Sequence, residues 1–178
     1  MENSVIIAGF GGQGVILAGK ILAQAGMDYG LEVTWLPSYG PEMRGGTANC
    51  TIVLSDEPIG SPVVDNPTGL IAMSLPSLDK FEKALAGAGT VIVNSSLIPR
   101  RVGREDVREV TVPVNDIAAS LGNPKVINMV ALGAFIKATG IIPLSVIKRA
   151  MVNMLSHDDK RELIEVNQRA LEAGYNTV

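Results

Sequence analysis

The chain contains one cysteine, Cys50, and one histidine, His157, among its 178 residues. A single cysteine cannot form an internal disulfide. Without a group of cysteines or histidines the sequence also has no motif for zinc or for an iron–sulfur cluster. We therefore expect no metal site in this chain, and a chain of this length can bury a core without covalent crosslinks. His157 lies outside every motif, so we expect it to cap a helix or to lie on the surface rather than to transfer protons.

Long hydrophobic runs and a large excess of charge are also absent. The longest apolar run, residues 129–136, is far below the ~18 residues that a membrane span needs. The first apolar segment begins within five residues of Met1, which leaves no room for a signal peptide, and we expect a cytoplasmic protein. A net charge of −3 and a pI near 5.2 argue against a nucleic-acid partner. We expect the arginines of "IPRRVGRED" to lie in a solvated loop.

Short apolar segments alternate with segments of helical periodicity. This pattern is typical of the α/β class, here a Rossmann-like three-layer α/β/α domain with a mostly parallel, mixed sheet. We predict strands at 5–8, 32–36, 48–54, 69–73, 90–94 and 109–112, and helices at 12–29, 78–86, 116–121, 124–138, 144–153 and 159–173. The strand at 48–54 follows its predecessor across a loop too short for a crossover helix, so it should run antiparallel. Because no segment has the composition of a linker, residues 1–178 are predicted to form one domain.

The stretch "IIAGFGGQGVILAGKILAQAG" places three glycines, Gly9, Gly11 and Gly14, at the spacing G-x-G-x-x-G between a strand and a helix. A dinucleotide site also needs an acidic residue about 20 positions later, which bonds a ribose hydroxyl. Glu32 precedes the second strand instead of ending it. The fingerprint for nicotinamide or flavin dinucleotides is therefore incomplete.

A second loop, "PSYGPEMRGGTANCTIV", contains two prolines and three glycines within ten residues. Ligands of open α/β sheets bind outside the carboxyl ends of the strands, so both glycine-rich loops should line one crevice. Arg44 is a candidate partner for phosphate or carboxylate, and Asn94, which ends a later strand, should face the same crevice. The alternatives are an ordinary glycine-rich connection with an exposed arginine, and an asparagine that only caps a turn.

Five motifs follow one another in a characteristic order: "GFGGQGV", "SYGPEMRGG", "SLPSLDKF", "VIVNSSLIP" and "GNPKVINMVALGA". They resemble the gamma subunit of the 2-oxoacid:ferredoxin oxidoreductases, which is also one domain of the single-chain pyruvate enzyme, over residues 5 to about 148. The resemblance implies a non-autonomous enzyme subunit, in a complex that oxidatively decarboxylates a 2-oxoacid to an acyl-CoA and reduces ferredoxin. It also implies thiamine diphosphate, magnesium and iron–sulfur clusters. This chain lacks both the GDG motif for magnesium–thiamine diphosphate and the cysteines, so these groups are implied on the partner alpha, beta and ferredoxin-like delta subunits.

For this subunit the resemblance implies a share in the coenzyme A site. A glycine loop at a helix N-terminus suits that role, since the amides and the helix dipole there favour a pyrophosphate. The residues implied are Gly11, Gly12, Gln13, Gly14, Val15, Arg44, Gly45 and Gly46, with Asn94 at the strand end. No catalytic residue is expected here. Single-chain relatives carry lysines where this sequence has Glu42 and Met43, so Arg44 is the only basic side chain left in that loop. We expect 2-oxoglutarate as the substrate, with pyruvate and branched-chain oxoacids next.

Two helices bear on assembly. The segment "NPKVINMVALGAFIKATG" is apolar nearly all round, which is typical either of a core helix or of one that packs partly on a catalytic subunit. The charged last helix, 159–173, packs on the domain or on a partner. Two other functions remain open at this point: an autonomous Rossmann-type NAD(P)-binding oxidoreductase, and a scaffold that only assembles other chains.

Overall fold

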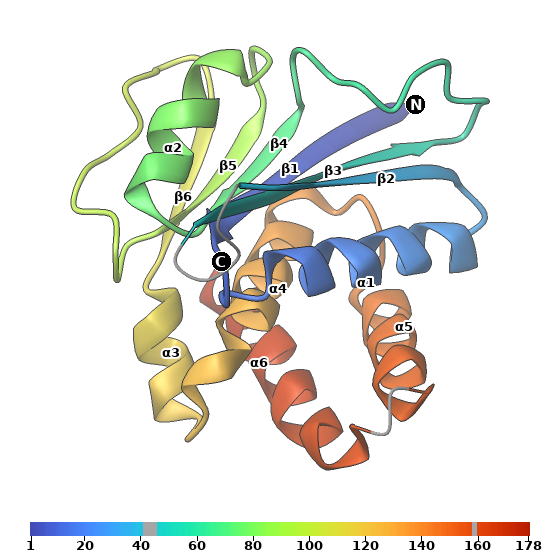
Figure 1. Ribbon diagram of the computed structural model, residues 1–178, viewed down its shortest axis with the longest axis vertical. Helices are drawn as coiled ribbons and strands as arrows, with labels where there is room; N and C mark the ends of the chain where they lie inside the picture. The colour runs from blue at the N-terminus through green and yellow to red at the C-terminus, as the bar shows by residue number, and fades with distance from the viewer. Residues whose placement is uncertain (41–45, 158–159) are drawn as a thin grey trace.

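The computed structural model describes residues 1–40, 46–157 and 160–178. Its centre is one six-stranded sheet in the order β2-β3-β1-β4-β5-β6 (Figure 1). The strands are β1 (Glu2–Phe10), β2 (Glu32–Tyr39), β3 (Thr47–Ser55), β4 (Gly69–Ala72), β5 (Thr90–Asn94) and β6 (Arg108–Val112). β3 runs antiparallel to both β1 and β2, whereas β1, β4, β5 and β6 pair in parallel. The prediction of a mixed sheet with an antiparallel third strand is confirmed.

Helices cover the two faces of the sheet unequally. Figure 1 shows α2 on one side of the sheet and α1, α4, α5 and α6 on the other. The helices are α1 (Val15–Asp28), α2 (Leu75–Phe81), α3 (Val114–Ser120), α4 (Ile127–Thr139), α5 (Leu144–His157) and α6 (Ile164–Thr177). Alternate residues of β1 serve the two faces: Val5 and Ile7 join the large core beneath α1 and α4, and Ile6 and Ala8 join the smaller core beneath α2. Within the described residues, no helix has the length and apolar character to cross a membrane.

Several helices begin or end at residues other than those predicted. α1 begins at Val15 and not at residue 12, because Gly12 and Gly14 have φ of +93° and +73°, outside the helical region. α2 begins three residues before the predicted start and ends in a 3₁₀ turn at Glu82–Ala84. α5 continues to His157, so this residue ends a helix instead of preceding one, and it is exposed. The predicted start of the last helix, residue 159, lies outside the described residues.

α4 is buried on nearly all sides within this chain. Of its residues 127–136, all are buried, as predicted for a helix covered all round. The last helix, α6, lies against it at two glycines: a Cβ on Gly133 would overlap the Leu171 carbonyl oxygen, and a Cβ on Gly174 would overlap the Val130 carbonyl oxygen. α6 therefore packs on the chain itself. Packing of its outer face on a partner stays a prediction.

Candidate functional site

The two glycine-rich loops lie side by side at the carboxyl edge of the sheet. The amide of Gly11 donates a hydrogen bond of 2.7 Å to the carbonyl oxygen of Gly46. The Gly40 amide donates a 2.8 Å hydrogen bond to the Thr47 carbonyl oxygen, which holds the two ends of the second loop together. A cleft of about 270 Å³ opens there, lined by Phe10, Gly11, Gly12, Gly14, Val15, Ile16, Tyr39, Gly40, Thr47 and Ala48. The two loops thus line one cleft, as their positions after β1 and β2 predict.

The N-terminus of α1 opens onto this cleft without a side-chain cap. Gly14 occupies the cap position, where no side chain accepts from the first-turn amides. Among the described residues, the hydrogen bonds of this loop include none from the amides of Gly12, Val15 or Ile16. Unpaired amides at a helix N-terminus favour an anion, because the N–H groups and the helix dipole both present positive charge.

Gly12 has free space beside it. A Cβ on Gly12 would meet no atom within 4 Å, although φ there is +93°. A Cβ on Gly14 would instead overlap the side-chain amide of Asn128. Gly12 therefore leaves room for a ligand, whereas Gly14 leaves room for another part of the protein.

Asn128 is a residue of this region that sequence analysis missed. It lies in the first turn of α4 and is only 5% exposed. Its Nδ2 donates a 3.0 Å hydrogen bond to the Gly14 carbonyl oxygen, so α4 holds the start of α1 in place. A polar side chain within the otherwise apolar run "INMVALGAFI" is the signal that was available, because buried polar groups need partners.

Gln13 does not line the cleft, although it was predicted to hold the ligand. Its Oε1 accepts from the Phe10 amide at 2.7 Å, and its Nε2 donates to the Met73 carbonyl oxygen at 3.3 Å. The side chain thus ties the loop to the end of β4. The reason is local: Gln13 is three positions after Phe10, so its side chain can fold back on its own turn.

Asn94 lies at the same edge of the sheet but beneath the surface. It is fully buried, and its Nδ2 donates to the Met73 carbonyl oxygen at 3.1 Å and to Asn115 Oδ1 at 2.8 Å. Its Oδ1 accepts from the Ser96 amide at 3.3 Å. With these partners Asn94 joins the ends of β4 and β5 to the start of α3 and does not line the cleft. Of the remaining predicted residues, Arg44 and Gly45 lie outside the described residues.

The described walls of the cleft carry no charged side chain. Phe10, Val15, Ile16 and Ala48 supply apolar surface, and Tyr39 is 54% exposed beside them. Polar recognition by the described walls therefore falls to the backbone and to the hydroxyls of Tyr39 and Thr47. Such a surface suits a ligand with an anionic part at the amides and an apolar part along the wall.

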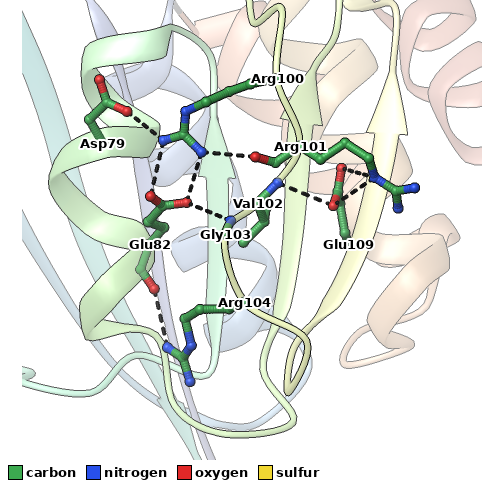
Figure 2. Close-up of polar contacts among 8 residues, drawn as sticks. All are labelled: Asp79, Glu82, Arg100, Arg101, Val102, Gly103, Arg104 and Glu109. Carbon is green, nitrogen blue, oxygen red and sulfur yellow. Dashed lines mark hydrogen bonds and ion pairs between the residues drawn. The ribbon is translucent and has the colours of Figure 1, made fainter.

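The arginines between β5 and β6 are matched by acidic side chains. Figure 2 shows Arg100 between the carboxylates of Asp79 and Glu82, which raise the pKa of Arg100, Glu82 foremost. Arg101 pairs with Glu109 at 3.3 Å, and Arg104 pairs with Asp106 and donates to the Glu82 carbonyl oxygen. The Gly103 amide also donates to Glu82. The segment is a loop, as predicted, and its charged side chains hold it against α2.

Cys50 lies beneath α1 and has no access to the cleft. It is 0% exposed, and its thiol lies 3.5 Å from the Val15 carbonyl oxygen. Burial raises the pKa of the Cys50 thiol to about 12, so the thiol stays protonated near neutral pH. Among the described residues, no three side chains of histidine, cysteine, aspartate or glutamate come together as metal ligands.

Comparison with protein families gives one match over nearly the whole chain. The family described as pyruvate ferredoxin/flavodoxin oxidoreductase matches residues 4–177. The ketoisovalerate oxidoreductase subunit VorA of Methanothermobacter thermautotrophicus is 40% identical over 97% of this chain, which spans 36% of that relative. The 2-oxoglutarate synthase subunit KorC of Methanocaldococcus jannaschii is 34% identical, over 98% of this chain and 93% of its own length.

Two solved structures share the fold. The gamma subunit of a keto/oxoacid ferredoxin oxidoreductase from Geobacter sulfurreducens superposes with a TM-score of 0.83 at 28% identity, covering 98% of this chain and 96% of that one. A 2-oxoglutarate:ferredoxin oxidoreductase from Magnetococcus marinus, solved with 2-oxoglutarate, coenzyme A and succinyl-CoA, has a TM-score of 0.88. It is 21% identical, and the match covers 99% of this chain and 31% of that one, so this likeness is one of fold.

Proposed function

The chain belongs to the pyruvate ferredoxin/flavodoxin oxidoreductase family, and on this premise we propose that it is the gamma subunit of a 2-oxoacid:ferredoxin oxidoreductase that contributes to the coenzyme A site. The observation that carries the proposal is the bond between Gly11 and Gly46, which joins the two glycine-rich loops around the open N-terminus of α1. Coenzyme A has the chemistry that this cleft favours, since it combines a diphosphate with a long, largely uncharged arm.

The strand order argues against the alternative of a dinucleotide-binding dehydrogenase. In the dinucleotide fold the acid that bonds the ribose ends the strand next to β1. Here β3 runs antiparallel between β1 and β2 and separates them. Glu32 opens β2, at the end opposite to the cleft. An adenosine placed on the glycine loop would therefore find no ribose acid on β2.

The reactive cofactors of the proposed complex belong on partner chains. Iron–sulfur clusters need several cysteine thiolates, and the one cysteine here is buried and protonated. We propose that alpha and beta subunits, with a ferredoxin-like delta subunit, carry thiamine diphosphate, magnesium and the clusters and pass electrons to ferredoxin. The chain spans about a third of the length of the VorA relatives and nearly all of the KorC relative.

For the substrate we propose 2-oxoglutarate first, then branched-chain oxoacids and pyruvate. Relatives named for all three are found: KorC, VorA and PorC, the last at 29% identity from Thermotoga maritima. No described side chain in the cleft selects among 2-oxoacids, because the described walls carry no charge that would pair with a second carboxylate. Selection among oxoacids then rests on the partner subunits.

The substitution Gly12→Asp tests the coenzyme A assignment in the assembled enzyme. A carboxylate there fills the free space above the loop and repels a pyrophosphate. We expect the KM for coenzyme A to rise about a hundredfold, which corresponds to about 3 kcal/mol. Formation of the thiamine adduct from the 2-oxoacid should be nearly unchanged, because that step precedes the use of coenzyme A. Steady-state kinetics and rapid-quench measurements give the two quantities.

Gly30→Asp is the matched control. Gly30 lies just beyond the other end of α1 and has φ of +90°, and a Cβ added there would also meet no atom within 4 Å. Both variants therefore bear the same backbone strain, but only Gly12 faces the cleft. Equal KM values for coenzyme A in the wild type and in a folded, assembled Gly12→Asp enzyme would leave assembly as the role of this chain.

A further inference from the structure

A groove along the outer side of α1 begins where the cleft ends. Ile16, which lines the cleft, also lines a second hollow of about 480 Å³ together with Leu17, Lys20, Met154 and Lys160. A third hollow continues past Lys20 and Met154 toward Met27 and Trp35. The walls of this third hollow come from α1, from the end of α5 and from β2. α1 and α5 lie beneath the same face of the sheet (Figure 1). The groove is thus an extension of the cleft formed by segments far apart in the sequence.

Two lysines flank the second hollow above an apolar floor. Lys20 and Lys160 are both exposed, and within the described part of the chain neither forms an ion pair with a carboxylate. The ammonium of Lys20 lies 5.3 Å from the centre of the Trp35 ring, which holds it beside the groove. Ile16, Leu17 and Met154 form the apolar floor. Among the described residues that line this hollow, the charged side chains are these two cations.

We propose that Lys20 and Lys160 bind the 3′-phosphate of the coenzyme A whose diphosphate lies at the glycine loop. This inference rests on the proposed function, because the loop supplies the first anchor. The 3′-phosphate and the 5′-diphosphate are carried by the same ribose, so their binding sites must be neighbours. Lys20 lies four residues beyond Ile16, which is one helical turn or about 6 Å along α1. The apolar floor is then available to the adenine ring.

The chemistry of the two side chains suits a phosphate monoester. An exposed ammonium is a compact charge with three donors, and two of them can share the oxygens of one dianion. The described walls of the cleft offer the diphosphate backbone amides and two hydroxyls, those of Tyr39 and Thr47, but no cation. Discrimination between coenzyme A and a ligand without the 3′-phosphate would therefore fall to the groove.

The test compares coenzyme A with 3′-dephospho-coenzyme A in the assembled enzyme. We expect the wild type to show a KM for the dephospho compound about a hundredfold higher, the product of two contributions of about tenfold. In Lys20→Gln and Lys160→Gln the KM for coenzyme A should rise about tenfold each, and in the double variant it should reach the value for dephospho-coenzyme A. The KM for dephospho-coenzyme A should stay within twofold in all three variants, because the contact removed is absent from that complex.

Lys137→Gln is the matched control. Lys137 is likewise exposed and lies over an aromatic ring, 4.9 Å from the centre of Tyr175, but it lines none of the three hollows. It should leave both KM values unchanged. An equal rise of both KM values in the lysine variants, or a wild type that does not distinguish the two compounds, overturns the inference.

Loss of the partner subunits on purification of the lysine variants would assign the groove to protein docking and would also overturn it. The proposed function fails by a different measurement. If Gly12→Asp leaves the kinetics with coenzyme A unchanged, the glycine loop holds no diphosphate, whatever the lysine variants do.

Discussion

At the scale of single residues, the glycines of the first loop have different physical roles. A Cβ on Gly9 would overlap Gln13 Oε1 and approach Met73 Cβ to 2.9 Å, so this glycine permits the loop to close on β4. Gly14 permits the contact with Asn128. Gly12 alone combines positive φ with open space on the cleft side. One sequence motif therefore contains two packing positions and one position suited to a ligand.

Cys50 supports a prediction about pH. Burial raises the pKa of its thiol from 9.0 to about 12, so above pH 9 the unfolded chain loses this proton while the folded chain keeps it. The free energy of unfolding should then fall by about 1.4 kcal/mol per pH unit above pH 9, until the folded thiol also ionises. Cys50→Ala removes this dependence. Urea denaturation of the wild type and of Cys50→Ala at pH 7 and pH 10 measures this pH dependence.

The expected result is a stability difference between wild type and Cys50→Ala that changes by about 1.4 kcal/mol between the two pH values. All other titrating groups are shared by the two proteins and cancel in the comparison. A difference that stays constant from pH 7 to pH 10 would mean that the thiol ionises as readily in the folded chain as in the unfolded one.

At the scale of elements, α4 and α6 pack in close backbone contact. Gly133 and Gly174 let the two backbones approach until each glycine lies against a carbonyl oxygen of the other helix. Ala134, Ala170 and Leu171 are fully or almost fully buried around this contact. α4 also carries Asn128 against the glycine loop, so α6 supports the candidate site through α4.

Gly174→Ala tests this contact. In most helices a change from glycine to alanine stabilises by up to about 1 kcal/mol. Here the added methyl group would overlap the backbone at Val130, which cannot move without displacing α4. We expect the free energy of unfolding to fall by about 3 kcal/mol, measured by urea denaturation.

Gly103→Ala is the control for that substitution, because Gly103 has open space and no positive φ. It should change stability by less than about 0.5 kcal/mol. If Gly174→Ala were as stable as the wild type, α6 would pack more loosely on α4 than the structure shows.

At the scale of the whole molecule, the chain is a family member in whose described residues no three metal-ligating side chains come together. Its one cysteine is buried, and its single histidine is exposed at the end of α5. Leu36, on the edge strand β2, is 44% exposed. Tyr39 adds exposed apolar surface at the cleft. These features fit a chain that works within an assembly.

The purified chain alone should therefore show no visible chromophore and no oxidation of 2-oxoacids. Absorbance spectra and an assay with an artificial electron acceptor test both expectations. Co-expression with alpha, beta and delta subunits should give a stable complex in which activity appears. Activity of the lone chain, or its recovery only as a free monomer after co-expression, would contradict the proposed division of labour.

Much of the fold follows from local patterns in the sequence. All six strands lie where apolar residues are clustered, and β3 is antiparallel because the loop before it is too short to cross over. The two glycine-rich loops could be assigned to one cleft, since both leave the carboxyl edge of the sheet. These features depend on residues that are close together in the sequence, so they can be predicted from the sequence alone.

The positions of the polar side chains around the cleft depended on contacts between segments that are distant in the sequence. The side chains of Gln13 and Asn94 turn to the Met73 carbonyl oxygen and not to the cleft, and Asn128 reaches Gly14 from 114 positions away. Lys160 comes beside Lys20 only because α5 ends against α1. The short-range periodicity of apolar residues indicates which face of a helix or strand is apolar. Which polar groups then meet is set by packing of the whole chain, where most buried donors find an acceptor.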